Sequence, residues 1–203
     1  MTRAELKSIS KEQIKGNLLT LFLISLIVYG LSALCGAIPV IGSLASVFVL
    51  TPAFAIAQIM IYLELTKGTK PEVGDILKGF NHFWIAFKTT FLTGLFVMLW
   101  SLLLYVPGII KACSYSQAMY IVAENPEIGA REAIDQSKAM MEGHKMDYFL
   151  LVLSFFGWAL LGALTFGILY IWLIPYMQTT FANFYNSIKP ATIEEPTYLN
   201  ENF

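Results

Sequence analysis

The chain has 203 residues, of which 57% are hydrophobic and only 13% charged, and its formal net charge is −1. Soluble domains carry about 25% charged residues, so this composition, with a mean hydropathy of +0.64, indicates a protein whose solvent is largely lipid. A nearly neutral chain is not expected to bind nucleic acid. The two cysteines, Cys35 and Cys113, lack the spacing of a redox or zinc motif.

Apolar runs long enough to cross a bilayer, which takes about 20 helical residues, alternate with short polar segments. We therefore predict an all-α polytopic membrane helix bundle of about six spans. The predicted spans are Leu18–Cys35, Ile41–Leu65, Phe83–Tyr105, Ile109–Ala123, Asp147–Phe166 and Ile168–Ile188. The first also resembles a signal peptide, but no clear cleavage site follows it, so we expect it to remain as a membrane helix.

Three of these spans carry features that should disturb a regular helix. Pro52 is expected to kink the second span, and Pro107 with Gly108 to end the third. The fourth span is short and polar, so it needs shielding by neighbouring helices or a tilted or partly re-entrant path.

A short polar segment with an apolar stripe precedes each pair of spans. Thr2 and Glu5 form a capping-box pattern at the start of the first segment, Thr2–Lys15. The second lies within Thr66–His82, and its stripe consists of Val73, Ile76, Leu77 and Phe80. The third is Glu127–Glu142, with a stripe of Ala130, Ala133, Ile134, Ser137 and Met141. We predict three amphipathic helices in the headgroup layer; for the first, a solvated terminal helix is the alternative.

Three glycines mark where these polar segments meet the apolar runs. Gly16, Gly79 and Gly143 are 63 and 64 residues apart. This spacing predicts one unit used three times, over residues 1–65, 66–126 and 127–188, within a single membrane domain of residues 1–188. Each unit would be a hairpin of the same orientation. Residues 189–203, with two prolines and mostly acidic charge, are predicted to be a disordered cytoplasmic tail.

The basic residues predict the orientation in the cell membrane. With the N-terminus inside, 12 of the 13 lysines and arginines fall on the inner side, as the positive-inside rule requires. Lys111 is the exception. Both termini are therefore expected in the cytoplasm.

No catalytic motif of the serine-hydrolase, Walker, zincin or dinucleotide-binding type occurs in the chain. We therefore expect no enzymatic activity, no cofactor and no metal. His82 and His144 lie near the repeat glycines, and we interpret them as interfacial imidazoles, because their surroundings lack the spacing of metal ligands.

Lys111 is the most unusual single residue, because an ionisable group within a span is costly. Its ammonium can snorkel to the outer headgroups. On the other interpretation, it lines a polar crevice that receives an anionic lipid headgroup or a peptide carboxylate. The candidate crevice residues are Lys111, Ser114, Tyr115, Gln117 and Gln178. Glutamines in spans more often serve as hydrogen-bonding partners between helices.

A resemblance is carried by several stretches of the chain, among them Val106–Ile110, Ile121–Pro126, Met141–Lys145, Leu153–Trp158 and Trp172–Tyr176. In these stretches the chain resembles one family of bacterial integral membrane proteins, the Domain of Unknown Function 975. The segment around Ala133, Ser137 and Gly143 is also distantly similar to the membrane domain of some glycerophosphodiester phosphodiesterases, whose catalytic domain is absent here. The resemblance implies a membrane protein and supplies neither a mechanism nor site residues.

Two functions remain open on this reasoning. The favoured one is a non-enzymatic scaffold or accessory subunit that binds membrane lipids, another membrane protein or itself. The alternative is a small transporter or flippase-like permease with a polar crevice around the fourth span. A filled interior with an apolar lateral groove favours the first, and a continuous polar cavity the second.

Overall fold

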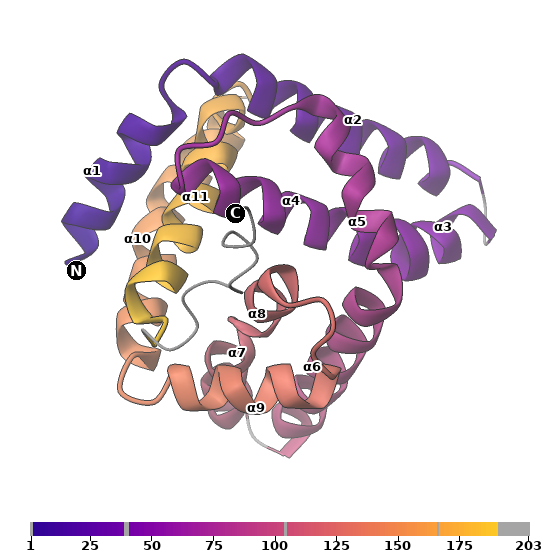
Figure 1. The fold of residues 1–203 in the computed structure, drawn as a ribbon, viewed down its shortest axis with the longest axis vertical. Helices are drawn as coiled ribbons and strands as arrows, with labels where there is room; N and C mark the ends of the chain where they lie inside the picture. The colour runs from indigo at the N-terminus through magenta and orange to yellow at the C-terminus, as the bar shows by residue number, and fades with distance from the viewer. Residues whose placement is uncertain (1, 39–40, 104, 166, 191–203) are drawn as a thin grey trace, which may run out of the picture.

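A computed structural model of the chain describes residues 2–38, 41–103, 105–165 and 167–190. Within these ranges the chain is helical, with short turns and no strand (Figure 1). The all-α prediction is confirmed.

The first unit begins with α1 (Arg3–Ile14), which opens with the predicted capping box. The amide of Glu5 donates to Thr2 Oγ1 at 3.3 Å, and the amide of Thr2 donates to the Glu5 carboxylate at 2.9 Å. The helices that follow are α2 (Leu18–Gly36), α3 (Ile41–Ala45), a π-helical turn η1 (Ser46–Leu50) and α4 (Thr51–Thr66).

Pro52 lies where the second predicted span is irregular. Proline has no amide hydrogen, and its ring displaces the carbonyl four residues earlier. The π-helical turn η1 ends two residues before Pro52, and its wider coil takes up this disturbance without ending the helix. A local π turn thus stands where we expected a kink.

The second unit departs most from the prediction. It contains a 3₁₀ turn η2 (Val73–Leu77), α5 (Lys78–Asn81), α6 (Phe83–Leu103), α7 (Tyr105–Tyr115) and α8 (Ala118–Glu124). The predicted fourth span is divided at Ser116 and Gln117. Pro107 falls in the first turn of α7, where a missing amide hydrogen costs nothing. In the predicted stripe over η2 and α5, Ile76 is buried, whereas Leu77 is 68% exposed.

The third unit contains α9 (Ala130–Met140), α10 (Lys145–Leu164) and α11 (Tyr170–Ile188). Every member of the predicted α9 stripe is buried. Lys189, where the predicted tail begins, caps α11 in the structure. Residues 191–203 of that tail lie outside the described residues.

Four segments are long and apolar enough to cross a membrane: α2, η1 with α4 (Ser46–Thr66), most of α6 (Phe83–Leu102) and α10. Helices α7 and α8 have 11 and 7 residues, so at about 1.5 Å per residue neither helix alone spans a hydrocarbon core of about 30 Å. The structure therefore supports a membrane protein with four candidate spans among the described residues.

The first helices of the three pairs lie around the outside of the molecule. In Figure 1, α2 runs along the upper edge to the right, α6 runs down to the bottom, and α10 lies at the left. The second helices of the pairs, α4, α8 and α11, meet through α4 in the middle. There the rings of Tyr120 and Tyr185 stack at 5.3 Å, and Tyr62 of α4 is buried.

The short helices between the pairs close this arrangement into a ring. Helix α5 packs on α4, α9 packs on α8, and α1 packs on α11. Each of these short helices therefore covers the second helix of a neighbouring pair. The outer surfaces of the pairs carry large apolar side chains, such as Trp84 at 69% and Leu102 at 81% exposure. Surfaces of this kind are stable in lipid and not in water.

Candidate functional site

The break between α7 and α8 brings three of the predicted crevice residues together. A break leaves a backbone carbonyl and an amide without helical partners. Ser137 of α9 binds both: its hydroxyl donates to the Ser114 carbonyl at 2.8 Å and accepts from the Gln117 amide at 3.1 Å. Ser114, Tyr115 and Gln117 are all buried beside this junction. The site therefore includes Ser137, which the sequence marked only as part of the α9 stripe.

The other two predicted crevice residues lie apart from this junction. Lys111 points its ammonium over the Trp100 ring, 4.7 Å from the centroid. Gln178 is half-buried on α11, a helix that packs mainly against α1, α4 and α10. In the described residues no hydrogen bond joins Gln178 to the other four.

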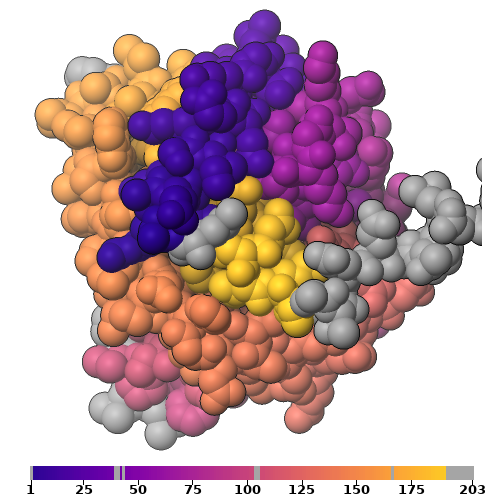
Figure 2. Space-filling model, turned by 60° about the vertical axis from the view of Figure 1, so that its left-hand side comes forward, coloured from indigo at the N-terminus to yellow at the C-terminus, as the bar shows by residue number. Residues whose placement is uncertain are grey.

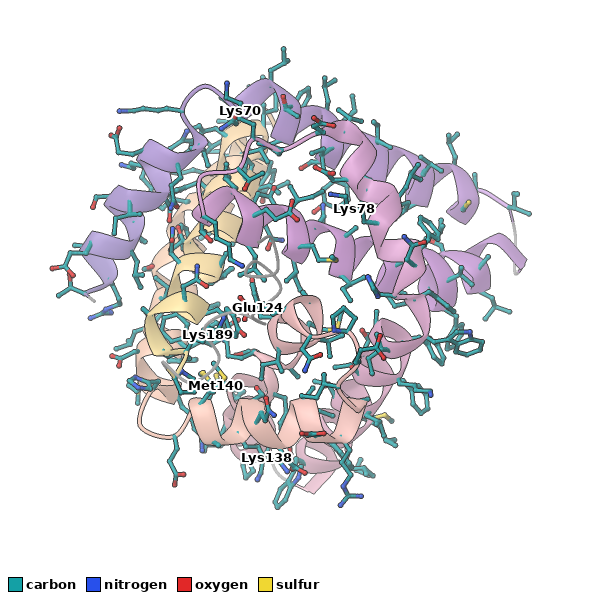
Figure 3. All side chains as sticks on the ribbon, viewed as in Figure 1. Lys70, Lys78, Glu124, Lys138, Met140 and Lys189 are labelled. Carbon is teal, nitrogen blue, oxygen red and sulfur yellow. The ribbon has the colours of Figure 1, made fainter. Side chains whose placement is uncertain are left out.

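A partly buried ion pair, not predicted from the sequence, lies at the centre where helix ends converge. Glu124, the last residue of α8, binds the Lys189 ammonium at 2.6 Å and accepts a hydrogen bond from the Tyr185 hydroxyl at 2.8 Å. Lys67, at the end of α4, lies 3.9 Å from the other carboxylate oxygen. The side chains of Glu124 and Lys189 are only 12% and 17% exposed. Figure 3 shows the two residues side by side near the middle of the molecule.

This ion pair ties together the ends of α4, α8 and α11. Its members are far apart in the sequence. The only local feature that could have indicated the ion pair is Glu124 itself, a charged residue at the end of an apolar run. Glu124 Oε2 has two partners, Lys189 and Tyr185, whereas Oε1 has no hydrogen-bond partner among the described residues. Loss of Glu124 would leave the Lys189 ammonium largely shielded from solvent without its counter-charge. The arrangement is suited to holding the ends of α8 and α11 together.

A row of basic side chains lies where α1 crosses the third unit. The Lys7 ammonium stands 4.3 Å from the centroid of the Phe155 ring, and the Lys11 ammonium 5.8 Å from that of Tyr176. The two rings touch edge to face, 5.4 Å apart. Burial lowers the pKa of Lys7, and the nearby charges of Lys11 and Arg3 lower it further. Figure 2 shows α1, in indigo, on the surface against the orange and yellow of the third unit.

An apolar groove runs along the outside of α10 and α11, next to these cations. It has a volume of about 240 Å³. Its wall includes Phe155 and also Phe149, Val152, Leu153, Phe156 and Met177. Phe155 therefore belongs both to the groove and to the place where Lys7 rests. The groove is lateral, as a site for a lipid chain would be.

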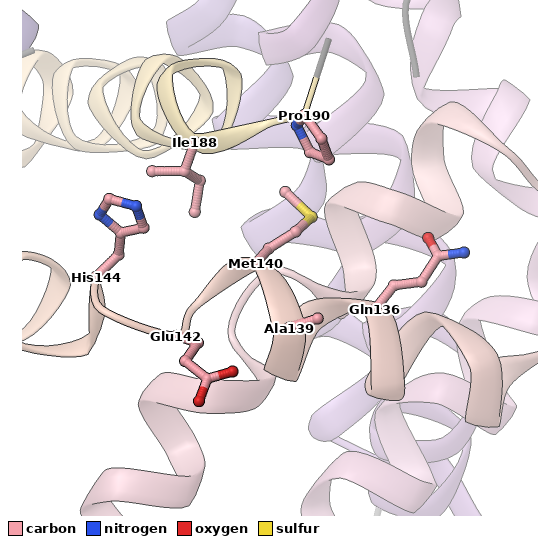
Figure 4. A pocket seen from close by; sticks show the side chains of 7 residues that line it. All are labelled: Gln136, Ala139, Met140, Glu142, His144, Ile188 and Pro190. Carbon is pink, nitrogen blue, oxygen red and sulfur yellow. The ribbon is translucent and has the colours of Figure 1, made fainter. Parts of the chain in front are cut away.

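A second hollow, of about 510 Å³, lies between the end of α9 and the end of α11 (Figure 4). Its lining is mixed, with Gln136 and His144 beside Met140 and Ile188. His144 Nδ1 lies 3.8 Å from Asp147 Oδ2. In the described part of the chain, no group of three or more histidine, cysteine or acidic side chains is placed to hold a metal ion. This hollow indicates no particular chemistry.

Comparison with known proteins gives one match. The model of the family described as "Protein of unknown function (DUF975)" matches residues 1–114 and 102–192. No protein with a curated description and no solved structure matches the chain. The distant similarity to the phosphodiesterase membrane domain finds no support in these comparisons.

Proposed function

Because the chain belongs to the DUF975 family of proteins of unknown function, we propose a role from its own residues: a non-enzymatic membrane protein that binds lipid along its third hairpin and serves as a scaffold or accessory subunit. The observation that carries this proposal is the apolar groove between α10 and α11. A lateral, apolar groove on a surface of exposed hydrophobic side chains is suited to an acyl chain.

We propose further that the chain is built from three similar hairpins crossing the membrane six times. Gly16 and Gly143 support this, because both have left-handed backbones, with φ of +83° and +84°. The residues just before α2, α6 and α10 also share one backbone conformation. Asn17 has φ −112° and ψ 2°, His82 has −110° and 20°, and His144 has −107° and −1°. Gly79 differs, because it is buried in α5 against α4.

The proposed orientation, in the cell membrane with both termini in the cytoplasm, is tested by thiol labelling. Single cysteines are placed at Ala37, Glu132 and Gly167 in a chain without Cys35 and Cys113. Glu132 is chosen on α9 because it is exposed, whereas Ser137 is fully buried. We expect a membrane-impermeant maleimide to label positions 37 and 167 in intact cells and position 132 only after permeabilisation. Labelling of position 132 in intact cells would contradict both the orientation and the six-span arrangement.

Lipid binding in the groove is tested by filling it. Leu153→Trp places a large ring at the groove, and Leu161→Trp makes the same change on α10 at a residue outside the groove lining. The two leucines are matched in exposure, at 52% and 50%. With a phospholipid carrying a photoreactive acyl chain, we expect cross-links to α10 and α11 to fall severalfold in Leu153→Trp and to persist in Leu161→Trp. Equal cross-linking in both variants and in the unchanged protein would refute lipid binding in the groove.

One observation favours the alternative, a flippase-like permease. The side-chain oxygen of Gln117 is buried and has no hydrogen-bond partner among the described residues, and unpaired buried groups mark strained or functional places. The test is scrambling of a fluorescent phosphatidylglycerol in proteoliposomes, followed by dithionite quenching. Protein-dependent scrambling that Gln117→Leu abolishes would establish this function in place of the scaffold. Quenching of only the outer leaflet would exclude lipid scrambling.

A further inference from the structure

The basic residues on one face of α1 are not matched by acidic partners. Arg3, Lys7 and Lys11 follow each other at four-residue intervals, so they share a face of the helix. In the described part of the chain, no carboxylate lies within ion-pair distance of any of the three. Four other lysines have a carboxylate at hydrogen-bonding distance, as Lys15 has in Glu12 at 2.6 Å. The unmatched lysines of α1 are distinguished by their aromatic contacts, with Phe155 for Lys7 and Tyr176 for Lys11.

These unmatched cations lie at the edge of an apolar surface. Lys7 rests on Phe155, which also lines the groove of α10 and α11. Lys11 rests on Tyr176, which touches Phe155. An aromatic face offers a cation only part of the stabilisation that a full negative charge gives. The Lys7 ammonium therefore rests on a ring that also lines the apolar groove, and Lys11 and Arg3 add positive charge on the same face of α1.

We propose that this place binds one anionic glycerophospholipid, with its phosphate between Lys7 and Lys11 and an acyl chain along the groove of α10 and α11. The proposal rests on the groove of the proposed function and adds the charge of the headgroup that it selects. A zwitterionic lipid would bring its own ammonium group close to Lys7 and Lys11, so the site discriminates against it by like-charge repulsion. An anionic headgroup instead brings the negative charge that these cations lack. Its charge also offsets the repulsion of Lys11 and Arg3 that lowers the pKa of Lys7.

The experiment uses the full chain in vesicles made of equal parts phosphatidylglycerol and phosphatidylcholine with identical acyl chains. Lipids that remain bound after gentle extraction are identified by native mass spectrometry. We expect the unchanged protein to be enriched in phosphatidylglycerol. The double variant Lys7→Gln/Lys11→Gln should lose this enrichment by about fivefold for each lysine removed, the usual effect of a basic residue at an anionic membrane surface.

Two control variants distinguish specific lipid binding at Lys7 and Lys11 from nonspecific attraction by the total positive charge of the protein. Lys15→Gln/Lys70→Gln removes the same total charge from exposed positions and should keep the enrichment. Lys7→Arg/Lys11→Arg preserves the charge and should also keep it, which shows that substitution at these positions does not by itself disrupt the protein. If the charge-matched control loses as much enrichment as Lys7→Gln/Lys11→Gln, the site does not exist.

The groove variant makes failure of this inference distinguishable from failure of the proposed function. If the unchanged protein retains both lipids equally and Leu153→Trp loses both, lipid binding stands and headgroup selection is refuted. If Leu153→Trp loses neither lipid while Lys7→Gln/Lys11→Gln loses phosphatidylglycerol, the cations bind the headgroup without the groove, and the proposed function is refuted. Loss of phosphatidylglycerol in both variants supports the whole site.

Discussion

Ser10 on α1 and Ser137 on α9 occupy corresponding places: both are fully buried, and each lies six residues before a left-handed glycine. Each hydroxyl also joins its own helix to the second helix of another pair. Ser10 accepts from the Asn183 side chain of α11 at 3.0 Å, and Ser137 binds the break between α7 and α8. Small hydroxyl side chains suit these places, because they let helices approach closely while binding polar groups.

Replacing Ser137 by alanine should destabilise the protein. Ser137→Ala leaves the Ser114 carbonyl and the Gln117 amide buried without a partner, at a cost of about 2 kcal/mol. For a chain of this size that lowers the thermal midpoint by roughly 4–8 °C, measured in detergent micelles. Ser8→Ala is the control, because the Ser8 hydroxyl is exposed and bonds only within α1. Equal thermal midpoints for the two variants would show that the hydrogen bonds of the Ser137 hydroxyl contribute nothing to stability.

Loss of the central carboxylate should also be destabilising. Glu124→Gln leaves the Lys189 ammonium largely buried without its counter-charge, which costs about 3 kcal/mol. The double variant Glu124→Gln/Lys189→Met removes both charges, so we expect it to recover part of the lost thermal stability. If the double variant is less stable than Glu124→Gln alone, the ion pair is not the reason for the loss.

Gly79 should tolerate no side chain, because α5 lies directly on α4 there. A Cβ atom at this position would lie 2.2 Å from the Ala53 carbonyl oxygen and 2.6 Å from Ala57 Cβ. Gly79→Ala must therefore push α5 away from α4, and we expect a drop in thermal midpoint of at least several degrees. Gly74→Ala is the matched control, since a Cβ there meets nothing within 4 Å. A Gly79→Ala protein as stable as Gly74→Ala would contradict this packing.

Asp75 makes one contribution to stability depend on pH. Burial tends to raise its pKa, but the hydrogen bonds from Lys78 and from the Glu72 amide outweigh this effect, so the pKa is lowered. A carboxyl group with a lowered pKa stabilises the folded state above its unfolded pKa of about 3.9, and the contribution is lost as the pH falls through the lowered value.

We therefore expect Asp75→Asn to be less stable than the unchanged protein at pH 7, by about 1 kcal/mol for the lost cap. This difference should shrink as the pH falls below about 4. Thermal midpoints of both proteins across that range measure it. A difference that is the same at pH 7 and pH 3 would show that the charge of Asp75 is not involved.

The sequence predicts the parts of this fold that depend on neighbouring residues. The capping box at Thr2 and the buried stripe of α9 follow from spacing within a single turn or helix, and both are confirmed. The break at Ser116 and Gln117 carries no proline or glycine to signal it. It is stabilised by Ser137, which lies twenty residues later, so no local pattern could have indicated it.

The candidate site was harder to predict for the same reason. Gln178 was selected for its residue type, but packing places α11 against α1, α4 and α10. The contact of Glu124 with Lys189 depends on helix ends that meet only in the folded chain. Likewise, no local pattern indicated that Lys7 and Lys11 of α1 would lie over Phe155 and Tyr176.

The ring of packed helices closes where α1 covers α11. During synthesis α1 leaves the ribosome long before α11 does, so the earliest helix must wait for the latest before it can reach its resting place. Leu6 and Ile14, which are buried in the folded chain, therefore cannot be fully covered on the α11 side until α11 has been made, so the ring cannot close before synthesis of the third hairpin is complete.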